Sequence, residues 1–149
     1  MLELKPFHHT ALDRMGAFQP IQAAQMAQHT AWRALTVEGA ENGPAWAVWD
    51  GPHVLATGGL RIVWQGRALA WALVADEVPK RAWPPMVLHA RRMLRQSRWM
   101  GIKRIEAIVP AFWEPGERLV AMLGFRCEAV MPQYGPDGSD YGLWSRIEE

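Results

Sequence analysis

The chain has 149 residues, half of them hydrophobic, which is enough for one α/β-sized domain with a sizeable core. Its formal net charge of +1 gives no overall field that would attract nucleic acid or an acidic membrane, and neither is expected as a partner. The single cysteine, Cys127, excludes an internal disulfide and favours a reducing compartment, and no apolar run approaches the ~20 residues that span a bilayer.

The first part of the chain predicts a strand followed by two helices. Leu2–Pro6 has apolar residues on one side, and a short helix follows from Thr10 until Gly16. Pro20 opens a second helix, whose apolar residues recur at helical spacing as far as Leu35. The glycine and proline content of Gly39–Pro44 then predicts a loop.

Three antiparallel strands are predicted next, at Trp46–Trp49, His53–Trp64 and Ala68–Ala75. Asp50-Gly51 and Gln65-Gly66 supply the turns between them. The Gly58-Gly59 pair inside the second strand predicts a bulge or a bend.

Ala68–Ala75 begins a strand, helix, strand unit that organises the chain. This strand is almost uninterrupted apolar sequence, so we expect it to be covered on both faces. A loop (Asp76–Trp83), a helix (Pro84–Trp99) and a parallel strand (Arg104–Val109) follow, which is the pattern of a right-handed crossover. Because ligands bind beyond the carboxyl ends of such strands, against the next helix, the candidate site lies at Leu73–Pro85.

The last part of the chain predicts a short helix and two strands. Pro115–Leu123 forms the helix, and Gly124 supplies its left-handed cap residue. The strands are Arg126–Met131 and Tyr141–Ile147, separated by the turn-forming Tyr134–Asp140. The whole chain is therefore predicted as a single α/β domain, residues 1–149, with a mixed, mostly antiparallel sheet flanked by helices.

This order of elements resembles the GNAT N-acetyltransferase superfamily over nearly the whole chain. The most specific feature is the Leu123-Gly124-Phe125 ending of the short helix, which is similar to the "LGF" that closes the fourth helix of the family. A closer resemblance is to a phage-encoded GNAT-like group that includes an internal virion protein of podophages. The fragments that carry it are Trp49-Asp50-Gly51, Trp71-Ala72-Leu73, Asp76-Glu77-Val78, Leu123-Gly124-Phe125 and Tyr134-Gly135-Pro136-Asp137-Gly138.

The resemblance implies a GNAT-like fold that binds acetyl-CoA as a cosubstrate in a V-shaped cleft between the strands Ala68–Ala75 and Arg104–Val109. The pantetheine arm would pair with the backbone of Leu73, Val74 and Ala75. The pyrophosphate would lie on the N–H groups of the following loop and helix N-terminus. An amine would then attack the thioester directly, while a group near the cleft takes its proton.

The sequence departs from this pattern where the pyrophosphate would bind. Val78–Pro85 contains no glycine, and its prolines have no N–H to donate. Lys80 and Arg81 are the candidate side-chain ligands of the phosphates, and Trp83 is the candidate for stacking on the adenine. A solvated basic loop is the alternative for Lys80 and Arg81.

No catalytic residue is assigned. The family's frequent Asn and Tyr positions are filled by Trp113 and Val120, and either Tyr134 or Tyr141 is a candidate replacement for the missing proton donor. Glu77 and Glu106 are candidate bases, but ordinary surface or hydrogen-bonded carboxylates are favoured. Cys127 is predicted as a buried, inert thiol, and the histidines show no spacing typical of metal ligands, so no metal is expected.

The leading hypothesis is an acetyl-CoA-dependent N-acyltransferase of phage or prophage origin, acting on an unidentified small-molecule or protein amine. The alternative is a catalytically inactive GNAT-fold protein of the virion or of host interaction, and a CoA-like ligand binder without transfer is a third hypothesis. The expected location is the bacterial host cytoplasm or the virion, where other virion proteins would be partners. Since the family often pairs through late strands, a homodimer through Tyr141–Ile147 is a further expectation.

Overall fold

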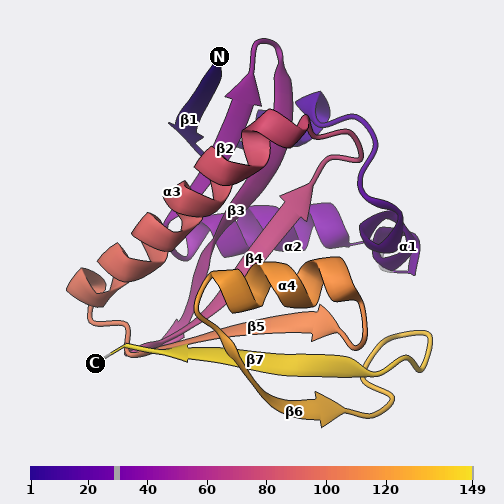
Figure 1. Ribbon diagram of the computed structural model, residues 1–149, viewed down its shortest axis with the longest axis vertical. Coiled ribbons are helices and arrows are strands. Elements are labelled where there is room, and N and C mark those ends of the chain that lie inside the picture. Colours follow the sequence, from indigo (N-terminus) through magenta and orange to yellow (C-terminus); the bar gives the residue numbers. More distant parts are fainter. Residues whose placement is uncertain (29–30, 149) are drawn as a thin grey trace. The chain divides into compact units, whose positions relative to one another are not determined.

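The computed structural model describes residues 1–28 and 31–148 and contains a mixed sheet of seven strands, in the order β1-β2-β3-β4-β5-β7-β6, flanked by helices (Figure 1). The strands are β1 (Leu2–Pro6), β2 (Ala45–Asp50), β3 (His53–Trp64), β4 (Arg67–Val74), β5 (Arg104–Pro110), β6 (Arg126–Met131) and β7 (Tyr141–Ile147). The helices are α1 (Pro20–Gln28), α2 (Trp32–Glu41), α3 (Trp83–Gln96) and α4 (Glu114–Met122), with 3-10 turns η1 (His9–Arg14), η2 (Lys80–Ala82) and η3 (Ser97–Met100). The predicted α/β class is confirmed.

The chain divides into two compact units. The first unit combines Met1–Arg61 with Ala70–Trp83, and the second combines Ile62–Leu69 with Pro84–Glu149. In the first unit, buried apolar residues of η1 pack with buried residues of β2 and β3. These core residues are Ala11, Leu12, Met15, Ala47 and Val54, and half-buried neighbours surround them at Phe7, Phe18, Trp32, Val37, Trp49 and Leu73.

The helical part of the first unit corrects two predicted boundaries. The helix predicted from Pro20 ends at Gln28, and α2 begins separately at Trp32; residues 29–30 lie outside the described residues. The predicted loop start at Gly39 is wrong, because α2 continues through this glycine to Glu41. The helix stops at Asn42, whose side chain donates a 2.7 Å hydrogen bond to the backbone oxygen of Glu38. Such a side-chain bond competes with continued helix.

The glycine pair of β3, predicted to form a bulge or a bend, forms no bulge in the pairing with β2. Gly58 and Gly59 stay in register opposite Trp46 and Ala45 of β2, and the register shift comes earlier, where Leu55 is the extra residue of β3. The lack of a side chain at Gly59 instead lets the backbone at Pro44 and Ala45 approach closely. A Cβ atom on Gly59 would lie 2.6 Å from the backbone oxygen of Pro44, well inside van der Waals contact.

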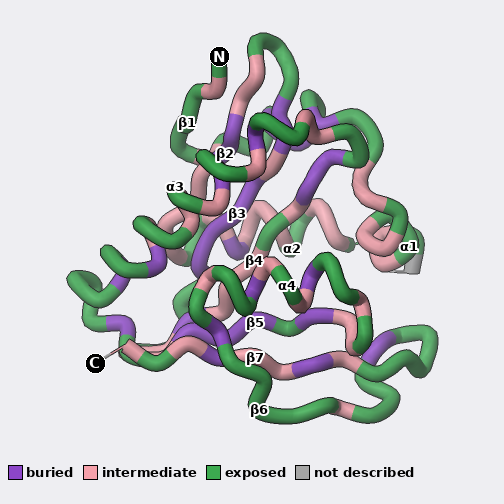
Figure 2. Tube along the Cα trace, in the orientation of Figure 1, coloured by how far each residue is buried: buried purple, intermediate pink, exposed green. Residues whose placement is uncertain are grey.

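In the second unit, β5 pairs along its whole length with β7, and β7 pairs with β6. β4 contributes its first residues, with Arg67, Ala68 and Leu69 opposite Arg104, Ile105 and Glu106 in parallel register. Figure 2 shows the contrast between β5, which is mostly buried, and β6, which is exposed along most of its length. β6 is therefore an edge strand, paired on one side by β7.

The end of α4 confirms the predicted cap. Gly124 has a φ of +92°, in the left-handed region, and the N–H of Phe125 donates to the Val120 oxygen at 2.9 Å. This is the backbone pattern of a helix closed by a left-handed residue. Phe125 is buried at 4% exposure directly after the turn.

Replacing Gly124 by Val is expected to lower the free energy of unfolding by about 1–2 kcal/mol, because a β-branched residue is strained at positive φ. Urea unfolding measures this loss. The control is Ala121→Val on the exposed side of α4, which should cost no more than about 0.7 kcal/mol, the spread of helix propensity. Equal losses in the two variants would contradict the cap assignment.

Candidate functional site

The strand β4 is divided between the two units. Its residues 67–69 pair in parallel with β5 in the second unit, and the rest of β4 belongs to the first unit. There, the N–H of Ala75 donates to the Leu55 oxygen of β3 at 2.9 Å. Since successive peptide groups of a strand face alternate edges, the N–H and C=O of Val74 face the edge away from β3.

That edge is covered by residues 17–22. The Gln22 side chain accepts a 2.9 Å hydrogen bond from the Val74 N–H, and its Nε2 donates to the Ala72 oxygen at 2.9 Å. The backbone N–H of Gln19 donates to the Val74 oxygen at 3.2 Å, and the Asp76 N–H donates to the Ala17 oxygen at 2.8 Å. The edge is thus covered partly by main chain and partly by a single side chain.

These hydrogen bonds show which backbone groups of Leu73, Val74 and Ala75, the residues predicted to pair with pantetheine, lie on the covered edge. Of Leu73, Val74 and Ala75, Val74 presents its N–H and C=O on the edge away from β3, and both are bonded within the protein. Ala75 donates its N–H to β3, and the half-buried Leu73 side chain packs against the core of the first unit. Sequence reasoning missed Ala72 and Gln22, because a glutamine in a helix carries no signal of a partner 50 residues away.

The loop after β4 carries the predicted phosphate ligands. Lys80 and Arg81 form the single turn η2 and are both exposed. Lys80 makes no ion pair with a described residue, whereas Arg81 donates to Asp50 Oδ2 at 3.1 Å. Both cations are accessible to a solvated anion.

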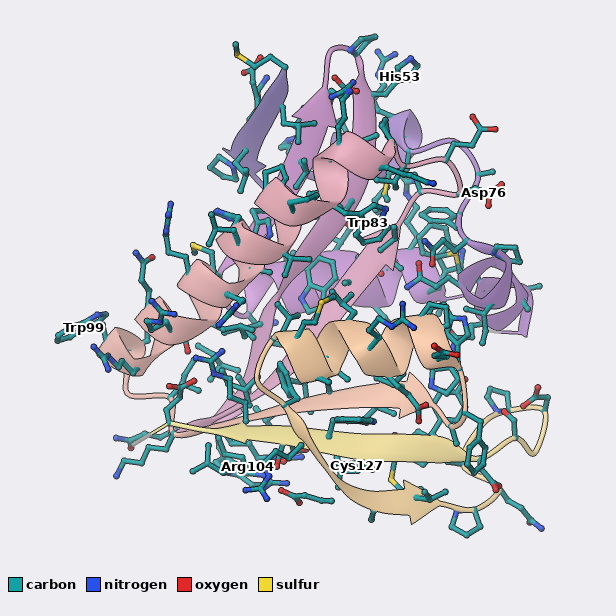
Figure 3. The ribbon with its side chains drawn as sticks, viewed as in Figure 1. His53, Asp76, Trp83, Trp99, Arg104 and Cys127 are labelled. Carbon is teal, nitrogen blue, oxygen red and sulfur yellow. The ribbon has the colours of Figure 1, made fainter. Side chains whose placement is uncertain are left out.

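The start of α3 offers few backbone donors. Trp83 is the first residue of the helix, is half-buried, and donates its N–H to the Lys80 oxygen. Pro84 and Pro85 follow and have no N–H. A phosphate at this helix start would therefore need side-chain donors. Figure 3 labels the exposed Asp76, which follows β4, and Trp83, which begins α3; the loop with Lys80 and Arg81 lies between them in the sequence.

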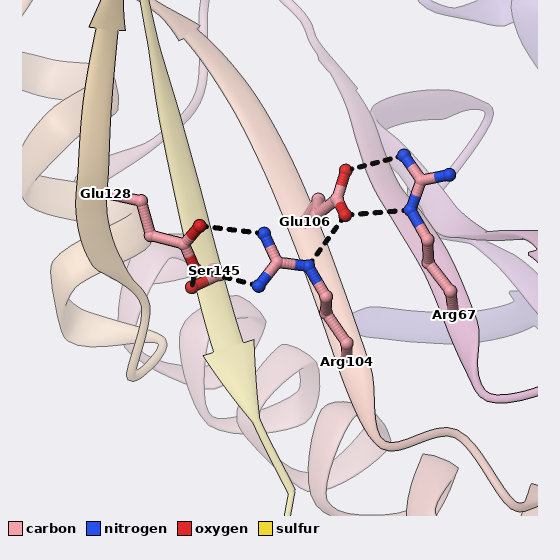
Figure 4. Close-up of polar contacts among 5 residues, drawn as sticks. All are labelled: Arg67, Arg104, Glu106, Glu128 and Ser145. Atoms are coloured by element: carbon pink, nitrogen blue, oxygen red, sulfur yellow. Dashed lines mark hydrogen bonds and ion pairs between the residues drawn. The ribbon is translucent and has the colours of Figure 1, made fainter.

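A polar network crosses four strands on one face of the second unit (Figure 4). Arg67 of β4 donates two 2.8 Å hydrogen bonds to the Glu106 carboxylate of β5. Arg104 donates to Glu106 at 2.7 Å and, through two further 2.8 Å bonds, to Glu128 of β6. Ser145 of β7 donates to the same Glu128 carboxylate. We refer to these five residues as the arginine–glutamate network.

The network keeps both carboxylates ionised. Hydrogen bonds from Arg67 and then Arg104 lower the pKa of Glu106 to about 2, and the Arg104 hydrogen bond likewise lowers the pKa of Glu128 to about 2. A carboxylate with so low a pKa is a weak base at neutral pH. The hydrogen-bonded alternative for Glu106 is thereby favoured over a catalytic role, and Glu77 is an exposed residue at the start of the loop.

The segment after β5 has packing groups at Trp113 and Val120, the two positions where the resemblance implies Asn and Tyr. Trp113 precedes α4 and packs so closely on Gly116 that a Cβ there would lie 2.4 Å from its ring. Val120 is buried at 8% exposure. The two tyrosines considered as replacements lie together, with ring centroids 5.4 Å apart, and Tyr141 pairs with Pro110 at the end of β5.

The remaining candidate groups do not assemble into a reactive centre. Cys127 is exposed, so the predicted buried thiol is wrong (Figure 3); it lies on the exposed edge strand β6. Burial lowers the pKa of His89, and His29 lies outside the described residues. Within residues 1–28 and 31–148, no three His, Cys, Asp or Glu side chains form a group suited to a metal ion. None of the described helices has the length and apolar character needed to cross a membrane.

The fold is that of the GNAT acetyltransferases. No protein-family model matches the chain, and no curated protein matches it in sequence. Among solved structures, Ard1 from Thermoplasma volcanium superposes with a TM-score of 0.78 at 16% identity, covering 99% of this chain and 98% of that one. An IAA acetyltransferase from Bacillus cereus superposes with a TM-score of 0.70 at 12% sequence identity, covering 99% of this chain and 100% of that one. A GNAT family acetyltransferase from Elizabethkingia anophelis with acetyl-CoA bound superposes with a TM-score of 0.68 at 11% sequence identity, covering 99% of this chain and 98% of that one.

Proposed function

We propose that this protein is an acetyl-CoA-dependent N-acyltransferase. The observation that carries the proposal is the edge of β4 away from β3, where Ala72 C=O and Val74 N–H bond to the Gln22 side chain, within a GNAT fold that matches acetyltransferases over nearly their full length. These two groups bond to a side chain, whereas the Val74 C=O on the same edge accepts from the main-chain N–H of Gln19. In open sheets, an edge of this kind at the carboxyl end of a strand is a ligand position.

In the proposed complex, the amide-bearing arm of acetyl-CoA pairs with the edge of β4. Lys80 and Arg81 neutralise the phosphates from the solvent side, and Trp83 stacks on the adenine. Side-chain cations take this role because Pro84 and Pro85 remove backbone donors from the helix start.

The proposed reaction is a direct acyl transfer. The amine nitrogen attacks the thioester carbonyl carbon, the C–S bond breaks, the CoA thiolate takes up a proton, and the amide nitrogen loses one. The usual tyrosine position in α4 holds the buried Val120, so another group has to protonate the thiolate. The acceptor is an amine of a small molecule or of a protein.

Two measurements on the full chain test this proposal. Calorimetric titration should give saturable 1:1 binding of acetyl-CoA, and release of free thiol should follow when amines are added from a panel of polyamines, amino acids and peptide N-termini. Absence of binding at millimolar acetyl-CoA would contradict the proposal. Binding without thiol release would favour a ligand-binding protein that does not transfer the acyl group.

The Lys80→Ala, Arg81→Ala double variant is expected to bind acetyl-CoA about tenfold more weakly, since both exposed cations lose their charge-assisted bonds to phosphate. Calorimetry at two salt concentrations measures the loss, which should shrink at high salt. Arg14→Ala, another exposed arginine of the first unit, is the control. Equal affinities of the wild type and the double variant would show that the phosphates bind elsewhere.

A second candidate function is a GNAT-fold protein without catalysis, acting in a phage particle or in host interaction. The observation that favours it is the replacement of the family's polar positions by packing residues, Trp113 against Gly116 and the buried Val120. Mass spectrometry of purified particles from a producing strain distinguishes the two. Presence in particles together with absence of thiol release would support this second function, whereas turnover in solution and absence from particles would eliminate it.

A further inference from the structure

We propose that the Gln22 carboxamide is an internal substitute for a ligand amide, and that it leaves the edge of β4 when a ligand binds. The identity of that ligand as acetyl-CoA rests on the function proposed above. Gln22 would then set the affinity of the site and restrict it to ligands that present two successive amides on a narrow, extended chain.

The geometry of the two hydrogen bonds carries the inference. Ala72 C=O and Val74 N–H are the two groups that flank Leu73 on one edge, and both lie 2.9 Å from atoms of the same carboxamide. In a parallel sheet, one residue of the neighbouring strand bonds to just such a flanking pair, using its own N–H and C=O. The Gln22 carboxamide therefore takes the place of one residue of a neighbouring strand, and the bond lengths are ideal for N–H···O.

The rest of the covering segment explains why Gln22 is the part that moves. Ala17 and Gln19 bond to β4 through their main chain, so removing them requires moving the backbone before α1. Gln22 reaches β4 only through its side chain from the first turn of α1, so rotation about its side-chain bonds releases both groups. A hydrogen bond between neutral groups contributes little net free energy, because water can replace either partner. A ligand can therefore displace the Gln22 side chain from β4 at low free-energy cost.

The chemistry of the released groups defines the ligand class. One acceptor and one donor, separated along the strand by a single residue, match an N–H and a C=O on the same side of an extended ligand chain, and these two groups belong to successive amides of that chain. A ligand without such a pair of amides gains nothing from the edge and leaves Gln22 in place. In the pantetheine arm of CoA, an unbranched two-carbon link joins the N–H of one secondary amide to the C=O of the next, whereas the nucleotide part has no amide.

The first test needs no ligand. In the Gln22→Ala variant, the Val74 amide proton loses its acceptor and is expected to exchange with solvent about five- to tenfold faster, measured by hydrogen exchange with NMR detection. Gln19→Ala is the matched control, because Gln19 bonds to β4 through its backbone alone. Unchanged exchange at Val74 in Gln22→Ala would overturn the assignment of Gln22 to the strand edge.

The second test measures binding to the wild type, Gln22→Ala and Gln19→Ala by calorimetry. Acetyl-CoA should bind Gln22→Ala about three- to tenfold more tightly than the wild type, because no internal amide has to be displaced. Adenosine 3′,5′-bisphosphate, which lacks the arm, should bind all three equally. Weaker or unchanged acetyl-CoA binding in Gln22→Ala would overturn displacement. If acetyl-CoA binds none of the three proteins, the proposed function is wrong, and acetyl-CoA does not displace Gln22. The hydrogen-exchange result still decides, independently, whether Gln22 covers the edge of β4.

Discussion

Replacing Glu106 by Ala is expected to lower the free energy of unfolding by about 3 kcal/mol. The carboxylate is buried at 7% exposure and accepts hydrogen bonds from two guanidinium groups, those of Arg67 and Arg104. Its removal leaves both cations without their shared partner inside the sheet, and breaking a buried ion pair from one side costs ~3–5 kcal/mol. The lower end applies because both arginines are partly exposed.

Urea unfolding at neutral pH measures this effect. The matched control is Glu3→Ala, which removes a carboxylate from an exposed ion pair with Lys5 at 3.8 Å. An exposed pair of this kind contributes at most about 1 kcal/mol. A loss in Glu106→Ala no larger than that in Glu3→Ala would show that the arginine–glutamate network does not hold the strands together.

The same network predicts how stability depends on pH. Glu106 and Glu128 have pKa values of about 2 in the folded protein, against an ordinary value of 4.5. Because the folded pKa is depressed, the stabilisation is complete above the ordinary pKa and is lost as the pH falls from 4.5 towards 2. The difference in unfolding free energy between the wild type and Glu106→Ala should therefore shrink between neutral pH and pH ~3. A difference that stays constant over this range would contradict the assignment.

Replacing Gly59 by Ala is expected to lower the free energy of unfolding by about 2–3 kcal/mol. The new Cβ would lie 2.6 Å from the Pro44 oxygen and 3.0 Å from Ala45 Cα, and both contacts are with backbone. A side chain could rotate away from such a clash, whereas here the two strands have to separate. Overpacking a buried position costs ~1–3 kcal/mol, and a rigid neighbour places this change at the upper end.

The control for this substitution is another buried glycine of the first unit. A Cβ on Gly39 in α2 would meet its nearest atoms at 3.9 Å, which is ordinary contact, and alanine is the better helix former. Gly39→Ala should leave the melting temperature unchanged or raise it. If the two variants behave alike in thermal unfolding, close approach of the strands at Gly59 is not what requires glycine there.

Local signals in the sequence predict most elements correctly. The bounds of β1, β3, β6 and β7 match the predicted ranges, because period-two apolar residues and glycine turns act over a few neighbouring positions. The left-handed Gly124 is confirmed for the same reason, since helix caps depend on local backbone geometry. The parallel order of β4 and β5 follows from the intervening helix.

Apart from the helix boundaries at Gln28 and Gly39, the errors and omissions concern contacts between distant residues. The position of Cys127 on the exposed edge strand β6 depends on which strand lies outermost, and alternation along one strand does not reveal that order. Gln22 meets β4 across 50 residues, and Arg67 meets Glu106 across 39. Such pairs depend on strand register and helix placement, which composition and periodicity leave undetermined.

The most direct test of the account is a crystal structure of the full chain grown with CoA. We expect the N–H of one pantetheine amide to bond with Ala72 C=O and the C=O of the next amide to bond with Val74 N–H, with the Gln22 side chain rotated away from both. A structure with CoA bound elsewhere on the protein, while Gln22 still bonds to β4, would contradict it.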